Sequence, residues 1–275
     1  MSAIRSAALV ATLAAVAAAG PAPALGADRG ADGRFEKRTS SHFVLYQDVD
    51  IDESHGLRGS RRFEHQVLET LEAAYQRLDD SLGLRPRRPL TVVVYDPGVF
   101  DARFSRLFRF PAAGFYEGTT HIRGDTVVHQ SLVRVLHHEL VHAAFDALAP
   151  SLALPAWLNE GLAEWFEARA VGKRHLSPQE RRALRDASQR GALFTMLQLS
   201  TTSFGHFGAP AARLAYLQSY AFVDFLARRK GERTLREVCD DLLRTGNLDR
   251  ALRRTYRADL SRLEERFFAE LDTRG

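Results

Sequence analysis

The segment 138–142, which reads H-E-L-V-H, constrains the fold of this chain more than any other feature. On a helix, residues four apart lie on one face, about 5–6 Å apart at Cβ, so His138 and His142 can reach a single ion. Glu139 lies about 100° further round the same helix, where it can take a proton from a water near that ion. Apolar residues flank the motif, so we expect a largely buried helix over 131–148.

The motif alone could arise by chance, and a third ligand would decide the class of site. Metzincins place glycine at position 145 and histidine at 148, whereas this chain has Phe145 and Leu148, which excludes that class. The segment 157–166 reads W-L-N-E-G-L-A-E-W-F and is expected to begin a second helix. A carboxylate on a helix packed against the first would complete a set of two histidines and one glutamate, as in thermolysin-type zinc sites.

The two segments together carry a family resemblance. H-E-x-x-H followed by N-E-G-x-A resembles the gluzincin superfamily, and the longer form W-L-N-E-G-L-A-E-W-F is similar to its small peptidase-MA-like members. The resemblance implies Zn²⁺ as the cofactor, Glu160 as the third ligand and Asn159 beside the ligands. It also implies that Glu164, one turn later, bonds the far nitrogen of His138, which would fix the tautomer of that ligand. The alternative for either glutamate is an ordinary acid on a helix surface.

A tyrosine could stabilise the oxyanion formed during peptide hydrolysis. The helical segment 214–226 resembles the helix on which gluzincin aminopeptidases carry a catalytic tyrosine in the pattern Y-x-x-G. Aligning the apolar runs places Tyr216 on that tyrosine and Ser219 on the glycine. A phenol there can donate a hydrogen bond to the oxyanion, an interaction worth a few kcal/mol. Tyr220 and His206 are the competing candidates, and each tyrosine could instead be a core residue.

A short motif before the metal helix suggests a substrate-binding residue. Aminopeptidases of the superfamily carry G-x-M-E-N on an edge strand, where the glutamate binds the amino terminus of the substrate. The segment 114–118 reads G-F-Y-E-G, so the resemblance implies a substrate-binding role for Glu117, although the Met and the Asn are missing. The better-supported expectation is an edge strand that pairs with an extended substrate.

The order of the elements predicts an α+β fold, because strand patterns occupy the first half and helical patterns the second. With the resemblance, this implies a minimal thermolysin- or gluzincin-like metallopeptidase fold. A small mixed sheet and the zinc helix would form an N-terminal lobe (28–150), and a mostly helical C-terminal lobe (151–275) would supply the third ligand across a cleft. We expect strands at 41–46, 89–95, 114–117 and 120–123, a turn at 96–98, and helices at 61–81, 131–148, 157–170, 178–189, 214–229, 234–244 and from 248 to the C-terminus.

The N-terminus predicts export. Arg5 precedes an uncharged, alanine-rich run that ends in small residues, which is typical of a signal peptide over 1–27. The alternative, an uncleaved membrane anchor, is disfavoured because the apolar part is shorter than the roughly 20 residues that a span needs. We expect a secreted or periplasmic protein with no stable membrane insertion. Its one cysteine, Cys239, cannot form an internal disulfide and fits an apolar helix face.

The charge of the chain excludes few classes of function, but it gives no support for nucleic acid as a partner. The net charge is +4, from 38 basic and 34 acidic residues that are interleaved along helices. We therefore predict an exported zinc-dependent peptidase that acts on peptide or protein substrates, with Glu139 as general base. Two alternatives remain: an exported zinc-binding or scaffold protein without activity, and a processing protease of narrow specificity that acts on a partner in the cell envelope.

Overall fold

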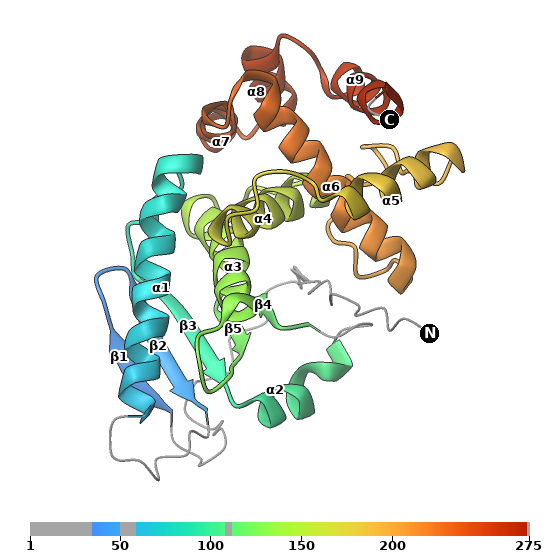
Figure 1. The fold of residues 1–275 in the computed structure, drawn as a ribbon. Coiled ribbons are helices and arrows are strands. Elements are labelled where there is room, and N and C mark those ends of the chain that lie inside the picture. Colours follow the sequence, from blue (N-terminus) through green and yellow to red (C-terminus); the bar gives the residue numbers. More distant parts are fainter. Residues whose placement is uncertain (1–34, 50–58, 108–111, 274–275) are drawn as a thin grey trace, which may run out of the picture.

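Figure 1 shows the computed structural model of the chain, which describes residues 35–49, 59–107 and 112–273. The strands are β1 (Glu36–Thr39), β2 (Phe43–Asp48), β3 (Leu90–Tyr95), β4 (Gly114–Tyr116) and β5 (Thr120–Arg123). The helices are α1 (Gly59–Leu82), α2 (Pro97–Phe104), the short 3-10 turn η1 (Ser105–Leu107), α3 (Gln130–Leu148), α4 (Ala156–Ala170), α5 (Pro178–Gln189), α6 (Ala209–Lys230), α7 (Arg233–Thr245), α8 (Leu248–Tyr256) and α9 (Leu260–Thr273). The predicted α+β class is confirmed, with the sheet in the first half of the chain and helices in the second.

The strands form one mixed sheet in the order β1-β2-β3-β5-β4. β3 lies at its centre, parallel to both β2 and β5, while β1 and β4 are antiparallel edge strands. Successive side chains of β3 alternate between two apolar clusters: Val92 and Val94 join the main core, whereas Val93 and Tyr95 pack with the aromatic residues of α2. Both faces of the sheet are therefore covered, which explains the continuous β-branched run of this strand.

α3 lies on the main-core face of the sheet, where it contacts α1, β4 and β5. It begins after His129, whose ring nitrogen accepts a hydrogen bond from the Leu132 N–H and so satisfies one free donor of the first turn. Every residue from Val135 to Phe145 is buried. A helix that is buried on all sides can hold polar side chains only where they find partners, and this helix carries the H-E-x-x-H motif.

α4 lies between α3 and α6 and packs against both (Figure 1). Its close approach to α6 depends on Gly161, because a Cβ there would lie 2.7 Å from the carbonyl oxygen of Ser219 and 2.7 Å from Cγ2 of Val223. The glycine after Glu160 thus lets two helix backbones meet at the level of the motif.

Three local expectations are wrong. The turn expected at 96–98 is the start of α2, since Pro97 begins the helix and the Asp96 carboxylate accepts a hydrogen bond from the Gly98 N–H. The single helix expected from 248 onward is divided at Arg257, a left-handed residue with φ 54°, and Asp259 accepts from the Arg262 N–H as α9 begins. The strand β1 was also not expected.

The predicted signal peptide, 1–27, lies outside the described residues, as does most of the segment after β2. Within the described ranges, no helix is both long and apolar enough to cross a membrane. Cys239 is a free, buried thiol on α7, as its place on an apolar helix face predicted, and burial raises its pKa.

Candidate metal centre

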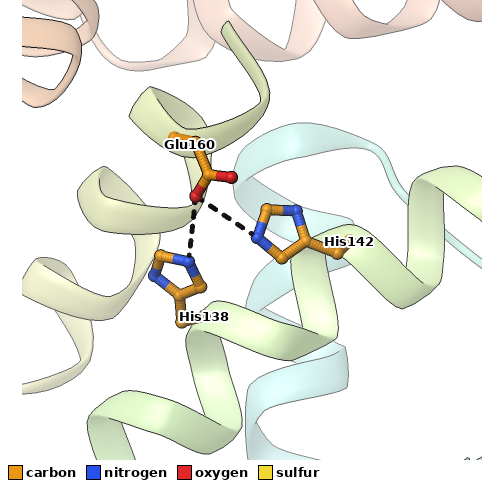
Figure 2. Close-up of side chains that lie close together, drawn as sticks. All are labelled: His138, His142 and Glu160. Carbon is orange, nitrogen blue, oxygen red and sulfur yellow. Dashed lines mark ion pairs between the residues drawn. The ribbon is translucent and has the colours of Figure 1, made fainter. Parts of the chain in front are cut away.

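Two helices bring three ligand atoms to one point (Figure 2). Nε2 of His138 and Nε2 of His142, both from α3, lie 3.4 Å and 3.6 Å from the same oxygen, Oε2 of Glu160 on α4. The three atoms all lie within 4.8 Å of one another, so a single ion could contact each of them. The i, i+4 spacing on α3 supplies one pair of ligands, and the antiparallel packing of α4 supplies the third.

The three ligand atoms are buried and lack hydrogen-bond partners. His138 and Glu160 are 0% and 1% exposed, and His142 is 4% exposed. No hydrogen bond reaches Nε2 of either histidine or Oε2 of Glu160. A polar atom left buried without a partner costs about 1–3 kcal/mol, so three that face one another fit a metal site better than a structural cluster. Two imidazoles and one carboxylate are a ligand set that suits Zn²⁺.

The opposite nitrogens of the two rings also lie close to polar side chains. The Nδ1–H of His142 donates to the side-chain oxygen of Asn159 at 3.0 Å, which presents Nε2 with its lone pair toward Glu160. Nδ1 of His138 lies 3.3 Å from Oε2 of Glu167. In the absence of a metal, burial lowers the pKa of His138, but Glu160 and Glu167 outweigh it and raise the pKa well above its usual value.

The contact with Nδ1 of His138 that was expected of Glu164 is made by Glu167 instead. Residues 160, 164 and 167 share one stripe of α4, but the ring of His138 reaches between Glu160 and Glu167. Glu164 is 8% exposed, and its Oε1 has no hydrogen-bond partner. Burial raises the pKa of Glu164 to about 8, and the neighbouring Glu167 adds to that rise. The sequence signal that could have identified Glu167 is its distance of seven residues, two helical turns, from Glu160.

Glu139 lies next to the ligands on α3 and is 0% exposed. Neither of its carboxylate oxygens has a hydrogen-bond partner. Its pKa is raised to about 8, chiefly by burial; His138 opposes the rise and the carboxylate of Glu160 adds to it. A buried carboxylate next to a possible metal, with both oxygens free to take a proton, has the chemistry of a general base.

Tyr216 on α6 lies near the carboxylates of the metal centre. Its hydroxyl is buried and has no hydrogen-bond partner, and its ring packs edge-on against Phe204 with centroids 5.2 Å apart. Burial and the nearby carboxylates of Glu160, Glu164 and Glu139 raise its pKa well above the usual value, so the phenol stays protonated.

The two competing candidates lie in other surroundings. The hydroxyl of Tyr220 is also buried without a hydrogen-bond partner, but the charges that act on it are those of Asp224 and Arg169, and the amine of Lys173 lies 4.5 Å from the centre of its ring. His206 packs edge-on against Phe207, with ring centroids 4.5 Å apart. Of the three candidates, only Tyr216 is surrounded by the acids of the metal centre.

Glu117 is not brought to this centre. It is exposed in the turn between β4 and β5, where its N–H donates to the carbonyl of Thr119. Among the described residues, no hydrogen bond or ion pair links it to the metal-centre side chains. The strand before it, β4, is an edge strand beside α3, as expected.

The fold and the site together are those of a metallopeptidase. The protein is α+β, and two of its helices, one with the H-E-x-x-H motif and one with the N-E-G-x-A motif, can hold a metal. The chain belongs to the peptidase MA superfamily, whose family model matches residues 70–273. The matched region runs from α1 to α9 and includes both metal-centre helices. A search of curated proteins found no match.

Proposed function

We propose that this protein is a zinc-dependent peptidase that hydrolyses peptide bonds. The observation that carries the proposal is the convergence of three buried, unpartnered ligand atoms on one point, with a free carboxylate from Glu139 and a free phenol from Tyr216 beside it. His138, His142 and Glu160 would hold the ion. When bound, zinc supplies Lewis acidity, which polarises the scissile carbonyl and acidifies water.

Each side chain has one task in the proposed reaction. Glu139 accepts a proton from the attacking water and then delivers it to the leaving amine. Tyr216 donates a hydrogen bond to the oxyanion that develops on the carbonyl oxygen. Asn159 keeps the ring of His142 in the tautomer that can bind the ion. The edge strand β4 would pair with the backbone of an extended substrate, and Glu117 at its end could meet one terminus of it.

We also propose that the protein is exported, with residues 1–27 as a signal peptide, and that it acts in a periplasm or outside the cell. A peptidase in that setting could degrade peptides broadly or process one partner of the cell envelope. A zinc-binding protein without activity is the rival, and it is disfavoured because it would have no use for a buried, unpartnered carboxylate at Glu139.

The test combines metal analysis with a peptide-library digest. The purified chain should contain about one zinc per molecule and cleave peptides, and a chelator should abolish the cleavage. Glu139→Gln should keep the zinc and lose hydrolysis. A Glu139→Gln variant that cleaves at the wild-type rate would refute the mechanism, and a zinc-loaded wild type inert toward the whole library would favour the rival or a narrow processing enzyme. The ends of the products would also separate endopeptidase from exopeptidase action.

A further inference from the structure

Arg134 is a charged residue behind the metal centre that the proposed reaction does not use. It lies one helical turn before His138 on α3 and reaches across to α4. Its Nε donates to Oε1 of Glu167 at 3.0 Å, and its Nη2 donates to the same oxygen. Because Oε1 takes both donors, the other oxygen of the carboxylate, Oε2, remains for Nδ1 of His138 at 3.3 Å.

We propose that Arg134 is a positioning residue for the metal centre, which it orients through Glu167 and His138. The inference rests on the proposed zinc site. It assigns to Arg134 a role beyond that of joining α3 to α4, because the guanidinium decides which oxygen of Glu167 meets the ligand and holds it there.

Burial supports this chain of contacts. The side chain of Glu167 is 3% exposed and that of His138 is 0% exposed, whereas Arg134 is 28% exposed. An ionised carboxylate that deep needs a cation, since an uncompensated buried charge costs several kcal/mol. Burial alone would lower the pKa of Arg134, but Glu167 beside it raises the pKa above its usual value, so the guanidinium stays charged.

The guanidinium also suits the geometry. Its planar fork presents two donors to one oxygen, which restrains the rotation of the carboxylate of Glu167. With the carboxylate fixed, its Oε2 stays 3.3 Å from Nδ1 of His138 and orients the ring, whose Nε2 lies 3.4 Å from Oε2 of Glu160. Without Arg134, the carboxylate of Glu167 would be free to turn, and His138 would lose the contact that orients its ring.

A purely structural role predicts a different result, and the chain offers a matched control. Arg169 joins α4 to α6 through Asp224 at 3.0 Å, with side chains that are 7% and 1% exposed, and it makes no contact with a ligand. Arg169→Met should therefore lower stability without changing zinc affinity. Arg134→Met should do both.

The experiment measures zinc dissociation constants by competition with a chromophoric chelator, together with the thermal midpoint of each metal-free variant. Arg134→Met and Glu167→Gln should each weaken zinc binding about 10–100-fold, the range for residues that orient metal ligands. The double variant should be no weaker than Glu167→Gln alone, because both changes act through one contact. Arg134→Lys, which is more conservative and guards against a folding failure of Arg134→Met, should bind zinc with intermediate affinity.

Two outcomes would overturn the inference. If Arg134→Met and Arg134→Lys bind zinc within twofold of the wild type while Glu167→Gln is weakened, Arg134 is only structural. If the effects of Arg134→Met and Glu167→Gln add fully, they do not share a route. A wild-type chain that binds no zinc would instead refute the proposed function itself, so the two failures are distinguishable.

Discussion

The contact between Gly161 and Ser219 gives a prediction in which local and tertiary effects oppose each other. Replacing glycine by alanine inside a helix normally stabilises the helix by about 1 kcal/mol. At position 161, however, the new Cβ would lie 2.7 Å from a backbone carbonyl oxygen, whereas ordinary contact begins at 3.4 Å. The backbones of α4 and α6 would have to separate locally by at least 0.7 Å, the difference between these two distances.

The separation should cost more than the helix gains. Overfilling a packed core typically destabilises a protein by about 1–3 kcal/mol, and here a backbone atom must move rather than a flexible side chain. We expect Gly161→Ala to lower the free energy of unfolding by about 2 kcal/mol, which corresponds to a fall of about 4–8 °C in thermal midpoint for a chain of this size. Zinc affinity should fall as well, because Glu160 precedes the displaced residue.

The assay is thermal and urea unfolding of the metal-free chain by circular dichroism, followed by zinc titration. Gly208→Ala is the control, because Gly208 has an ordinary φ of −66° and no atom lies within 4 Å of its hypothetical Cβ. Its effect should stay under about 1 kcal/mol. If Gly161→Ala is as stable as the wild type or more stable, the gain in helix propensity outweighs the cost of the steric contact. The close crossing of α4 and α6 is then not what holds the third ligand in place.

Three further predictions concern activity, metal and pH. Tyr216→Phe should lower kcat by about 10²–10³-fold at unchanged zinc content, while Tyr220→Phe should have little effect on kcat; equal losses would contradict the assignment. Removal of zinc by a chelator should lower the thermal midpoint, and readdition should restore it. Burial and nearby Arg103 lower the pKa of His121 from 6.5 to about 4. The free energy of unfolding should therefore decrease by up to about 3 kcal/mol as the pH is lowered from 6.5 to 4. Urea unfolding measures this loss, which His121→Gln should lack.

The sign of the pH effect follows from the surroundings of His121. Its ring stacks on Phe115 with centroids 4.7 Å apart, and its Nδ1 forms a 2.9 Å hydrogen bond with the hydroxyl of Tyr95. The folded protein thus holds the ring neutral down to about pH 4, whereas the unfolded chain takes up the proton near pH 6.5. Unfolding is therefore favoured as the pH falls from 6.5 to about 4. Above pH 6.5, where His121 is neutral in both states, it does not make stability depend on pH.

Local patterns in the sequence were sufficient where the determining contacts are also local. The helix predicted at 178–189 matches α5 because Ser177 and Glu180 form a complete capping box around Pro178. The same chemistry could have found α2, since Asp96 and Pro97 are a cap and a first-turn residue. The break at Arg257 had no such signal, because a left-handed arginine is not marked by residue type.

The metal centre separates what spacing predicts from what packing decides. The H-E-x-x-H spacing fixes two side chains on one face of α3, and the N-E-G segment predicts the third, so the convergence of His138, His142 and Glu160 could be expected before any fold was known. The acid behind His138 could be narrowed to Glu164 and Glu167, which lie one and two helical turns after Glu160 on the same stripe of α4, but the spacing does not choose between them.

The axial offset between α3 and α4 chooses between these two acids. That offset depends on the approach of α4 to α6 at Gly161 and on the reach of Arg134 to Glu167, both of which join residues far apart in the sequence. The choice also sets the charge beside the ligands. Glu167 is neutralised by a guanidinium, whereas the Oε1 of Glu164 stays unpartnered in the surroundings of Tyr216. Glu164→Gln should consequently leave zinc affinity near that of the wild type while Glu167→Gln weakens it, and the reverse order would restore the assignment made from the motif alone.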